Sequence, residues 1–121
     1  MSFDILNQPN YELAQEITAI DGSDITERIK NTIGTDGIVL FMKGNATQPM
    51  CGFSANSTAI LLSYGKEFKT FNILSDEGIR QGLKEFSNWP TFPQLYINGK
   101  LVGGNDIITE LHQDGELKEL F

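Results

Sequence analysis

Cysteine is almost absent from this chain of 121 residues, which contains only Cys51. A single thiol cannot form an intramolecular disulfide, so any thiol chemistry must take its second sulfur from another molecule. A free thiol also suits a reducing compartment, which favours a cytoplasmic location. His112 is the only histidine, so the chain offers little for a metal site of mixed ligands.

Long apolar runs and basic residues are scarce too. The longest apolar run, residues 38–42, is far shorter than the roughly 20 residues that span a bilayer. Residues 1–20 contain no Lys or Arg, so they lack the pattern of a signal or transit peptide. Acidic residues outnumber basic ones by 16 to 9, which argues against nucleic-acid binding. We therefore expect binding to neither membrane nor nucleic acid.

The length fits one domain, and the 40% of hydrophobic residues suffice for a core. Residues 1–20 contain no chemical motif and are interpreted as an N-terminal extension. Asn10 predicts the start of a short helix there, with Leu13, Ile17 and Ile20 as its apolar side. Residues 21–121 are interpreted as the domain itself.

Capping residues, apolar periodicity and turns predict an alternation of helices and strands in residues 21–121. The first strand–helix–strand unit should be a right-handed parallel crossover, and Asn98-Gly99 predicts an antiparallel type I′ hairpin. The fold class is therefore α/β, a mixed four-stranded sheet with helices on both faces. The expected elements are a helix from Asp24 to Gly34, a strand at 38–42, a helix from Cys51 to Tyr64, a strand at 68–74, a helix from Ser75 or Asp76 with Ile79, Leu83 and Phe86 inward, strands at 95–97 and 100–102, and a helix capped by Asn105 or Asp106.

Cys51 falls where a loop is expected to enter a helix. The first N–H groups of a helix are unpaired, and with the helix dipole they favour a thiolate over a thiol. Lys43, after the preceding strand, would add positive charge. The alternative is a small buried side chain, which is common for free cysteine. Phe53, beside the thiol, could either cover a bound ligand or pack in the core.

Ser54 stands where a dithiol redox motif has its second cysteine. A hydroxyl cannot resolve a mixed disulfide, so Cys51 must act as a lone sulfur with a borrowed partner. The sequence resembles the monothiol glutaredoxins, which have the thioredoxin fold, over roughly residues 24–120. The segments that carry this resemblance are Lys43-Gly44, Cys51-Gly52-Phe53-Ser54, Trp89–Gly99, and Gly103-Gly104 followed by Asp106.

The resemblance implies a glutathione site. Lys43 matches the lysine that meets a glutathione carboxylate, and Arg80 matches the arginine that pairs with the glycyl carboxylate. Phe92 matches the residue whose backbone pairs with the cysteinyl part, while Asn105 and Asp106 match the pair that holds the γ-glutamyl end. Two cations, an aspartate and a helix N-terminus suit a ligand with two carboxylates and one ammonium. From the residues alone, Arg80 would be a solvated charge and Asp106 a helix cap.

Two further points follow from the resemblance. It implies a cis peptide bond before Pro93, facing Cys51, although the local sequence alone favours a trans proline in a turn. Position 105 is often cysteine in this family, and Asn105 excludes a disulfide between that position and Cys51.

The resemblance implies an iron–sulfur carrier. A 2Fe-2S cluster takes four thiolates, which two copies of Cys51 and two glutathione molecules would supply in a homodimer. With Cys51 as the only protein metal ligand, the cluster would be labile and suited to transfer to apo iron–sulfur proteins, with BolA-like partners. The first alternative is an oxidoreductase that reduces protein–glutathione mixed disulfides. The second is an interaction domain with an inert cysteine.

Overall fold

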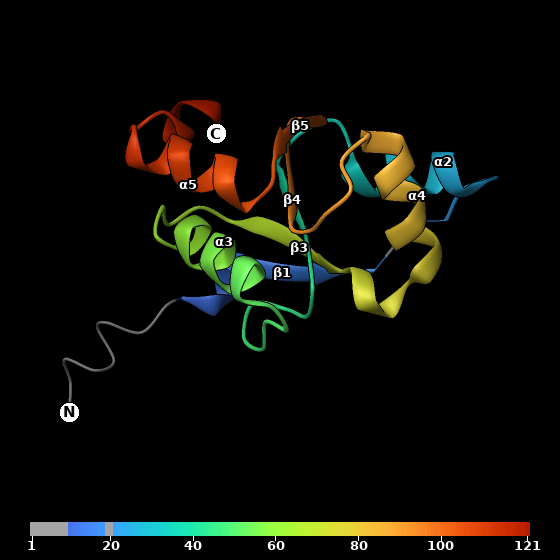
Figure 1. The fold of residues 1–121 in the computed structure, drawn as a ribbon, viewed down its shortest axis with the longest axis horizontal. Helices are drawn as coiled ribbons and strands as arrows, with labels where there is room; N and C mark the ends of the chain where they lie inside the picture. Colours follow the sequence, from blue (N-terminus) through green and yellow to red (C-terminus); the bar gives the residue numbers. More distant parts are fainter. Residues whose placement is uncertain (1–9, 19–20) are drawn as a thin grey trace.

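The computed structural model describes residues 10–18 and 21–121, which form one mixed sheet of five strands covered by helices on both faces (Figure 1). The strand order is β1-β3-β2-β4-β5. The strands are β1 Ala14–Ile17, β2 Ile38–Met42, β3 Phe68–Asn72, β4 Gln94–Ile97 and β5 Lys100–Gly103. The α-helices are α2 Ile25–Ile33, α3 Gly52–Leu62, α4 Glu77–Ser87 and α5 Asn105–Gln113, and the 3₁₀ turns are η1 Tyr11–Leu13, η2 Ile73–Ser75 and η3 Leu117–Leu120.

The strand pairing confirms the thioredoxin-like α/β fold. β3 pairs in parallel with β2, β4 runs antiparallel to β2, and β5 runs antiparallel to β4. Asn98 and Gly99 take positive φ values of 53° and 82°, which agrees with the predicted type I′ hairpin. None of the helices in the described ranges has the length and apolar character that crossing a bilayer requires.

The expectation of four strands was wrong by one, because β1 adds a strand at the edge of the sheet. Asn10 does cap a turn, accepting a hydrogen bond from the Glu12 N–H, but the turn is 3₁₀ and ends at Leu13. The next residues pair in parallel with β3, from Ala14 opposite Phe68 to Ile17 opposite Phe71. The pairing satisfies backbone groups that β3 would otherwise leave open at its edge. Ile20 of the expected helix lies outside the described residues.

β2 is buried on both faces and separates two apolar clusters. Ile38, Leu40 and Met42 point into the cluster that contains residues of α3 and α5. Val39 and Phe41 point to the other side, where residues of α2 and α4 pack. This alternation is what a central strand between two helical layers requires. The carboxyl end of β2 therefore lies between α3 and α4, and the chain leaves it toward Cys51.

Some helix boundaries and faces differ from those expected. α3 ends at Leu62, where Ser63 caps it, before the expected stop at Gly65. β3 ends at Asn72, whose side-chain oxygen accepts from the Leu74 N–H and starts η2. Phe86 was expected in the core, but its side chain is 41% exposed on α4. The predicted caps of α2 and α4 are confirmed: Asp24 and Asp76 each accept from a first-turn N–H.

Candidate functional site

Cys51 is the N-cap residue of α3, at the end of the loop that follows β2. The loop closes on itself, because the Met50 N–H donates to the Lys43 carbonyl at 2.8 Å. The Lys43 N–H in turn donates to the Ser54 hydroxyl at 3.1 Å, which ties the start of the loop to the first turn of α3. Gly44 is required here: its φ is 87°, and a Cβ would lie 2.4 Å from the Gln48 carbonyl oxygen. The loop thus holds Cys51 in one place.

The surroundings of Cys51 lower the pKa of its thiol. The backbone N–H of Ser54 contributes most, and the backbone N–H of Phe53, the Lys43 charge and the Ser54 hydroxyl act in the same direction against partial burial. The neutral thiol makes no capping hydrogen bond, so the N–H groups act by attracting negative charge on the sulfur. The reactive interpretation of Cys51 is therefore the one that the structure supports. The alternative of a small buried side chain is wrong, since Cys51 is only partly buried.

A pocket of about 370 Å³ opens beside the thiol. It brings together residues that lie far apart in the sequence, from Lys43 to Asp106, including every residue predicted for the glutathione site. Phe53 also lines it and is 62% exposed, so its alternative role as a core residue is wrong. The residues around the pocket are Lys43, Cys51, Phe53, Arg80, Lys84, Trp89, Thr91, Phe92, Pro93, Gly104, Asn105 and Asp106.

The segment before β4 forms one wall of the pocket that Cys51 lines. The Phe92–Pro93 peptide bond is cis, as the resemblance implied. The Gln94 side chain pins this segment, because its Nε2 donates to the carbonyls of Trp89 at 3.0 Å and Thr91 at 3.2 Å. The Tyr96 hydroxyl donates to Gln94 Oε1 at 3.1 Å and so orients the amide. Hydrogen bonds from the buried Gln94 and Tyr96 side chains therefore fix this wall of the pocket.

Positive charge gathers at this pocket in a protein of net charge −7. Lys43, Arg80 and Lys84 line it, and Asp106 is its one acidic residue. Among the described residues, the ion pair of Arg80 is with Glu77, at 3.7 Å, and its Nε is buried without a hydrogen-bond partner there. A guanidinium left this incompletely paired is prepared for an anion. The alternative of a solvated charge on the helix face therefore does not describe Arg80, whose side chain is 34% exposed.

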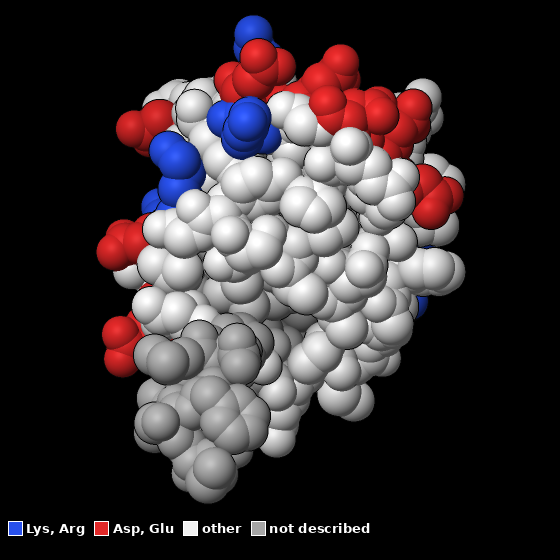
Figure 2. All heavy atoms as spheres, turned by 90° about the vertical axis from the view of Figure 1, so that its left-hand side faces the viewer, with Lys and Arg blue, Asp and Glu red and all other residues white. Residues whose placement is uncertain are grey.

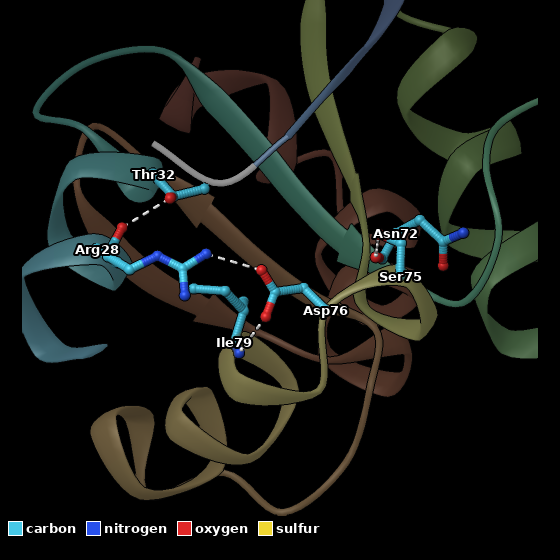
Figure 3. A network of polar contacts seen from close by, with 6 residues as sticks. All are labelled: Arg28, Thr32, Asn72, Ser75, Asp76 and Ile79. Carbon is cyan, nitrogen blue, oxygen red and sulfur yellow. Dashed lines mark hydrogen bonds and ion pairs between the residues drawn. The ribbon is translucent and has the colours of Figure 1, made fainter. Parts of the chain in front are cut away.

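Helix α4 carries both Arg80 and Lys84, and an ion pair sets its position (Figure 3). Asp76 Oδ1 accepts from the Ile79 N–H at 3.0 Å, and Oδ2 meets Arg28 Nη2 of α2 at 2.8 Å. These contacts keep the pKa of Asp76 below its ordinary value, although burial alone would raise it. The cap thus fixes the start of α4 against α2, one turn before Arg80.

The start of α5 forms another wall and requires a correction. The N-cap is Gly104, whereas Asn105 or Asp106 was expected, so neither side chain is used as a cap. Asn105 Oδ1 instead accepts from Asn56 Nδ2 at 2.8 Å and Ser57 Oγ at 2.9 Å, which joins α5 to α3. The Asp106 side chain is therefore not needed as a cap, and the first residues of α5, whose N–H groups have no partner within the helix, line the pocket.

Three lining residues, Lys84, Trp89 and Thr91, had no predicted ligand role. Lys84 follows Arg80 by one helical turn, a spacing that would have placed it on the same face. Gly104 packs so closely that a Cβ would lie 3.1 Å from the Trp89 indole nitrogen. His112 meets the Tyr64 hydroxyl at 2.5 Å and does not line the pocket. Within residues 10–18 and 21–121, no three or more His, Cys, Asp or Glu side chains group as metal ligands.

The central part of the chain, residues 38–102, matches the family model described as Glutaredoxin. The chain belongs to the glutaredoxin family. It is 55% identical over 92 residues to the "Probable monothiol glutaredoxin 2" of Rickettsia typhi, which covers 76% of this chain and 83% of that protein. Human glutaredoxin-3 is 49% identical over 108 residues, covering 88% of this chain and 32% of that protein.

A solved structure agrees with this family membership. The solution structure of reduced apo GrxS14 from poplar has a TM-score of 0.68 and 47% identity, and the match covers 78% of this glutaredoxin and 87% of that chain. With a single cysteine and relatives named as monothiol glutaredoxins, this glutaredoxin is of the monothiol type. It spans about a third of the length of human glutaredoxin-3.

Proposed function

We propose that this monothiol glutaredoxin binds glutathione beside Cys51 and carries a labile 2Fe-2S cluster between two copies of the chain. One observation carries the proposal: a lone thiol with a lowered pKa opens onto a pocket with three cations and one carboxylate. Glutathione has one thiol, two carboxylates and one ammonium, so its charges complement the pocket. Glutaredoxins generally bind glutathione, which supports the same assignment.

The pocket supports a definite orientation of glutathione. Arg80, with its unpartnered Nε, pairs with the glycyl carboxylate, and Lys43 meets a carboxylate close to the thiol. The backbone of Phe92 pairs with the cysteinyl part. The N-terminus of α5 at Asn105 binds the γ-glutamyl carboxylate, and Asp106 binds the ammonium. In this orientation the glutathione thiol lies next to Cys51.

The metal ligands that one chain offers are too few to hold a cluster alone, but they fit a cluster shared between two chains. Cys51 is the only thiol, and the described residues contain no other group of metal ligands around it. A 2Fe-2S cluster needs four thiolates, which a homodimer with two bound glutathione molecules supplies. Because half of the ligands are exchangeable small molecules, the cluster is cargo for transfer. The recipients are apo iron–sulfur proteins, with BolA-like proteins as further partners, in the reducing cytoplasm.

A second function uses the same site. The thiolate of Cys51 can attack the glutathione sulfur of a protein–glutathione mixed disulfide, which releases the protein thiol and leaves glutathione on Cys51. A second glutathione thiolate then attacks this mixed disulfide, forming oxidised glutathione and restoring Cys51. The lowered pKa of the thiol favours this chemistry.

Anaerobic reconstitution with iron, sulfide and glutathione separates these functions. We expect a coloured protein that elutes as a dimer, and a colourless monomer when glutathione is omitted or Cys51 is replaced in Cys51→Ser. Visible absorption and gel filtration are the measurements. A colourless monomer from the wild-type chain, together with fast turnover of a glutathionylated substrate, would overturn the carrier and establish the oxidoreductase.

A further inference from the structure

Two buried polar side chains lie behind the glutathione pocket without lining it. Gln94 and Tyr96 are separated by one residue on β4, so they share the face of the sheet that packs against α4. Their exposed fractions are 0% and 2%. The Tyr96 hydroxyl donates to Gln94 Oε1, and Gln94 Nε2 donates to the carbonyls of Trp89 and Thr91. Packing alone does not require these polar groups, because apolar side chains of the same shape can fill a core at little cost.

The same hydrogen bonds connect the pocket wall to the end of α4. The Trp89 N–H donates to Ser87 Oγ at 3.2 Å, and Ser87 Oγ donates to the Leu83 carbonyl at 2.6 Å. Trp89 is therefore held through its N–H by α4 and through its carbonyl by Gln94 of β4. Because α4 carries two of the three pocket cations, these bonds set where the wall lies relative to them.

Phe92 presents open backbone groups on this wall. It lines the pocket, and in the described part of the chain neither its N–H nor its carbonyl has a hydrogen-bond partner. The nearby carbonyls of Trp89 and Thr91 are instead occupied by Gln94. A peptide group that is both free and held in place is prepared to pair with the backbone of a ligand, since little ordering entropy is then lost on binding.

Tyr96 keeps the Gln94 side chain in one orientation. The Tyr96 ring packs edge-on against Phe41 of β2, with ring centroids 5.5 Å apart. Burial raises the pKa of Tyr96 to about 12, so its hydroxyl stays protonated. This hydroxyl donates to the oxygen of the Gln94 amide, which leaves the two N–H donors of Nε2 directed at the two carbonyls of the wall. The position of the wall is thus set from the centre of the sheet.

We propose that Gln94 and Tyr96 are positioning residues for glutathione. They hold the backbone of Phe92 at a fixed place relative to the cations of α4, so that one glutathione molecule binds through its cysteinyl part and its glycyl carboxylate at the same time. The inference rests on the proposed function and adds to it two residues that do not touch the ligand. Both act through residues 89–92.

The test removes these hydrogen bonds without changing the pocket lining. Tyr96→Phe deletes one hydroxyl and leaves Gln94 Oε1 buried without a partner, and Gln94→Met deletes the amide. Calorimetric titration of each full-length variant with reduced glutathione should show binding weakened by about three- to tenfold for Tyr96→Phe and by about ten- to thirtyfold for Gln94→Met. If Gln94→Met does not fold, Tyr96→Phe decides the result.

A shortened ligand separates positioning from a general loss of stability. γ-Glutamylcysteine lacks the glycyl carboxylate, so it does not have to reach from the wall to the cations of α4. Tyr96→Phe should therefore bind it within about twofold of the wild type. Trp89, the only tryptophan, is half-buried, and its fluorescence should be quenched more strongly by acrylamide in Tyr96→Phe and Gln94→Met, because its backbone is then less firmly held.

Tyr64→Phe is the matched control, because it deletes the same hydroxyl where Tyr64 meets His112, near the ends of α3 and α5. These two helices lie on the side of the molecule that Figure 2 shows, opposite α4 in Figure 1. Tyr64 does not line the pocket, so the control should bind glutathione within about twofold of the wild type and leave the quenching of Trp89 unchanged.

The outcomes distinguish this inference from the proposed function. If the wild-type chain does not bind glutathione, the proposed function itself fails. If the wild type binds it and Tyr96→Phe binds it equally well, this inference alone is overturned. An equal loss of affinity for glutathione and γ-glutamylcysteine, or the same loss in Tyr64→Phe, would also overturn it, because the hydroxyl would then support only the fold.

Discussion

Lys43 acts on Cys51 through charge rather than contact. Its ammonium is one of the influences that lower the pKa of the thiol, after the first-turn N–H groups of Ser54 and Phe53. Only the thiolate reacts with an alkylating agent, so the rate follows the ionised fraction. At a given pH, removal of this charge should therefore leave less thiolate and a slower reaction.

We predict that Lys43→Gln raises the pKa of Cys51 and moves the alkylation profile to higher pH. At pH 7 the iodoacetamide rate should fall by a factor of about two to ten, while the rate above the titration range should match that of the wild type. Lys66→Gln, which removes an exposed lysine from the turn after α3, is the control. Identical pH profiles for Lys43→Gln and wild type would show that the helix N-terminus alone activates the thiol.

Some residues of the candidate site could be predicted from their own place in the sequence, others only from the family resemblance, and some were missed. Cys51 and Lys43 flank one loop, so their proximity follows from local order along the chain. Arg80 and Asp106 came only from the family resemblance, because their own surroundings suggest a solvated charge and a cap. Lys84 was missed, since helical periodicity tells which residues share a face but not that this face borders a pocket.

At the scale of elements, the Arg28–Asp76 pair links α2 to α4 and carries a testable pH dependence (Figure 3). The pKa of Asp76 is lower in the folded chain than the ordinary 3.8. A depressed carboxyl pKa adds stability above the unfolded pKa, and this stability is lost as the pH falls through the folded pKa. The pair is part-exposed, with side chains 30% and 25% accessible, so its effect is modest.

We predict that Asp76→Asn, which keeps a capping oxygen but loses the charge, lowers the free energy of unfolding by about 1 kcal/mol at pH 7. The difference from wild type should shrink as the pH drops below about 4, because Asp76 is then protonated and, like the asparagine of the variant, carries no charge. Urea unfolding at several pH values is the measurement, and Asp36→Asn in an exposed turn is the control. A difference independent of pH would mean that the charge of Asp76 contributes nothing.

Most elements could be predicted because their signals are local, and the exceptions depend on distant partners. The caps at Asp24 and Asp76 and the Asn98-Gly99 turn act within a few residues. β1 could not be found in this way: Ala14–Ile17 is short and half polar, and its pairing partner β3 lies some fifty residues later. The start of α5 was misplaced because Gly104 caps through its backbone conformation, without a side-chain signal.

At the scale of the whole molecule, the acidic surface and the cationic pocket should respond to salt in opposite directions. Dimerisation brings together two chains that each have a net charge of −7 and so repel one another. Glutathione binding instead brings carboxylates to the cations Lys43, Arg80 and Lys84. Raising the ionic strength from 0.01 M to 0.1 M shortens the screening length from about 30 Å to about 10 Å. Long-range repulsion between copies is then weakened, and so is the attraction of the ligand to the pocket.

We therefore predict that added salt tightens the cluster-bound dimer and weakens glutathione binding, each by about two- to fivefold over this range. Sedimentation of the reconstituted protein and calorimetric titration of the monomer with glutathione measure the two effects. Potassium chloride and sodium chloride should act alike, since screening depends on ionic strength and not on the ion. A dimer that weakens with salt would instead indicate that ion pairs between the two copies hold it together, and would contradict this prediction.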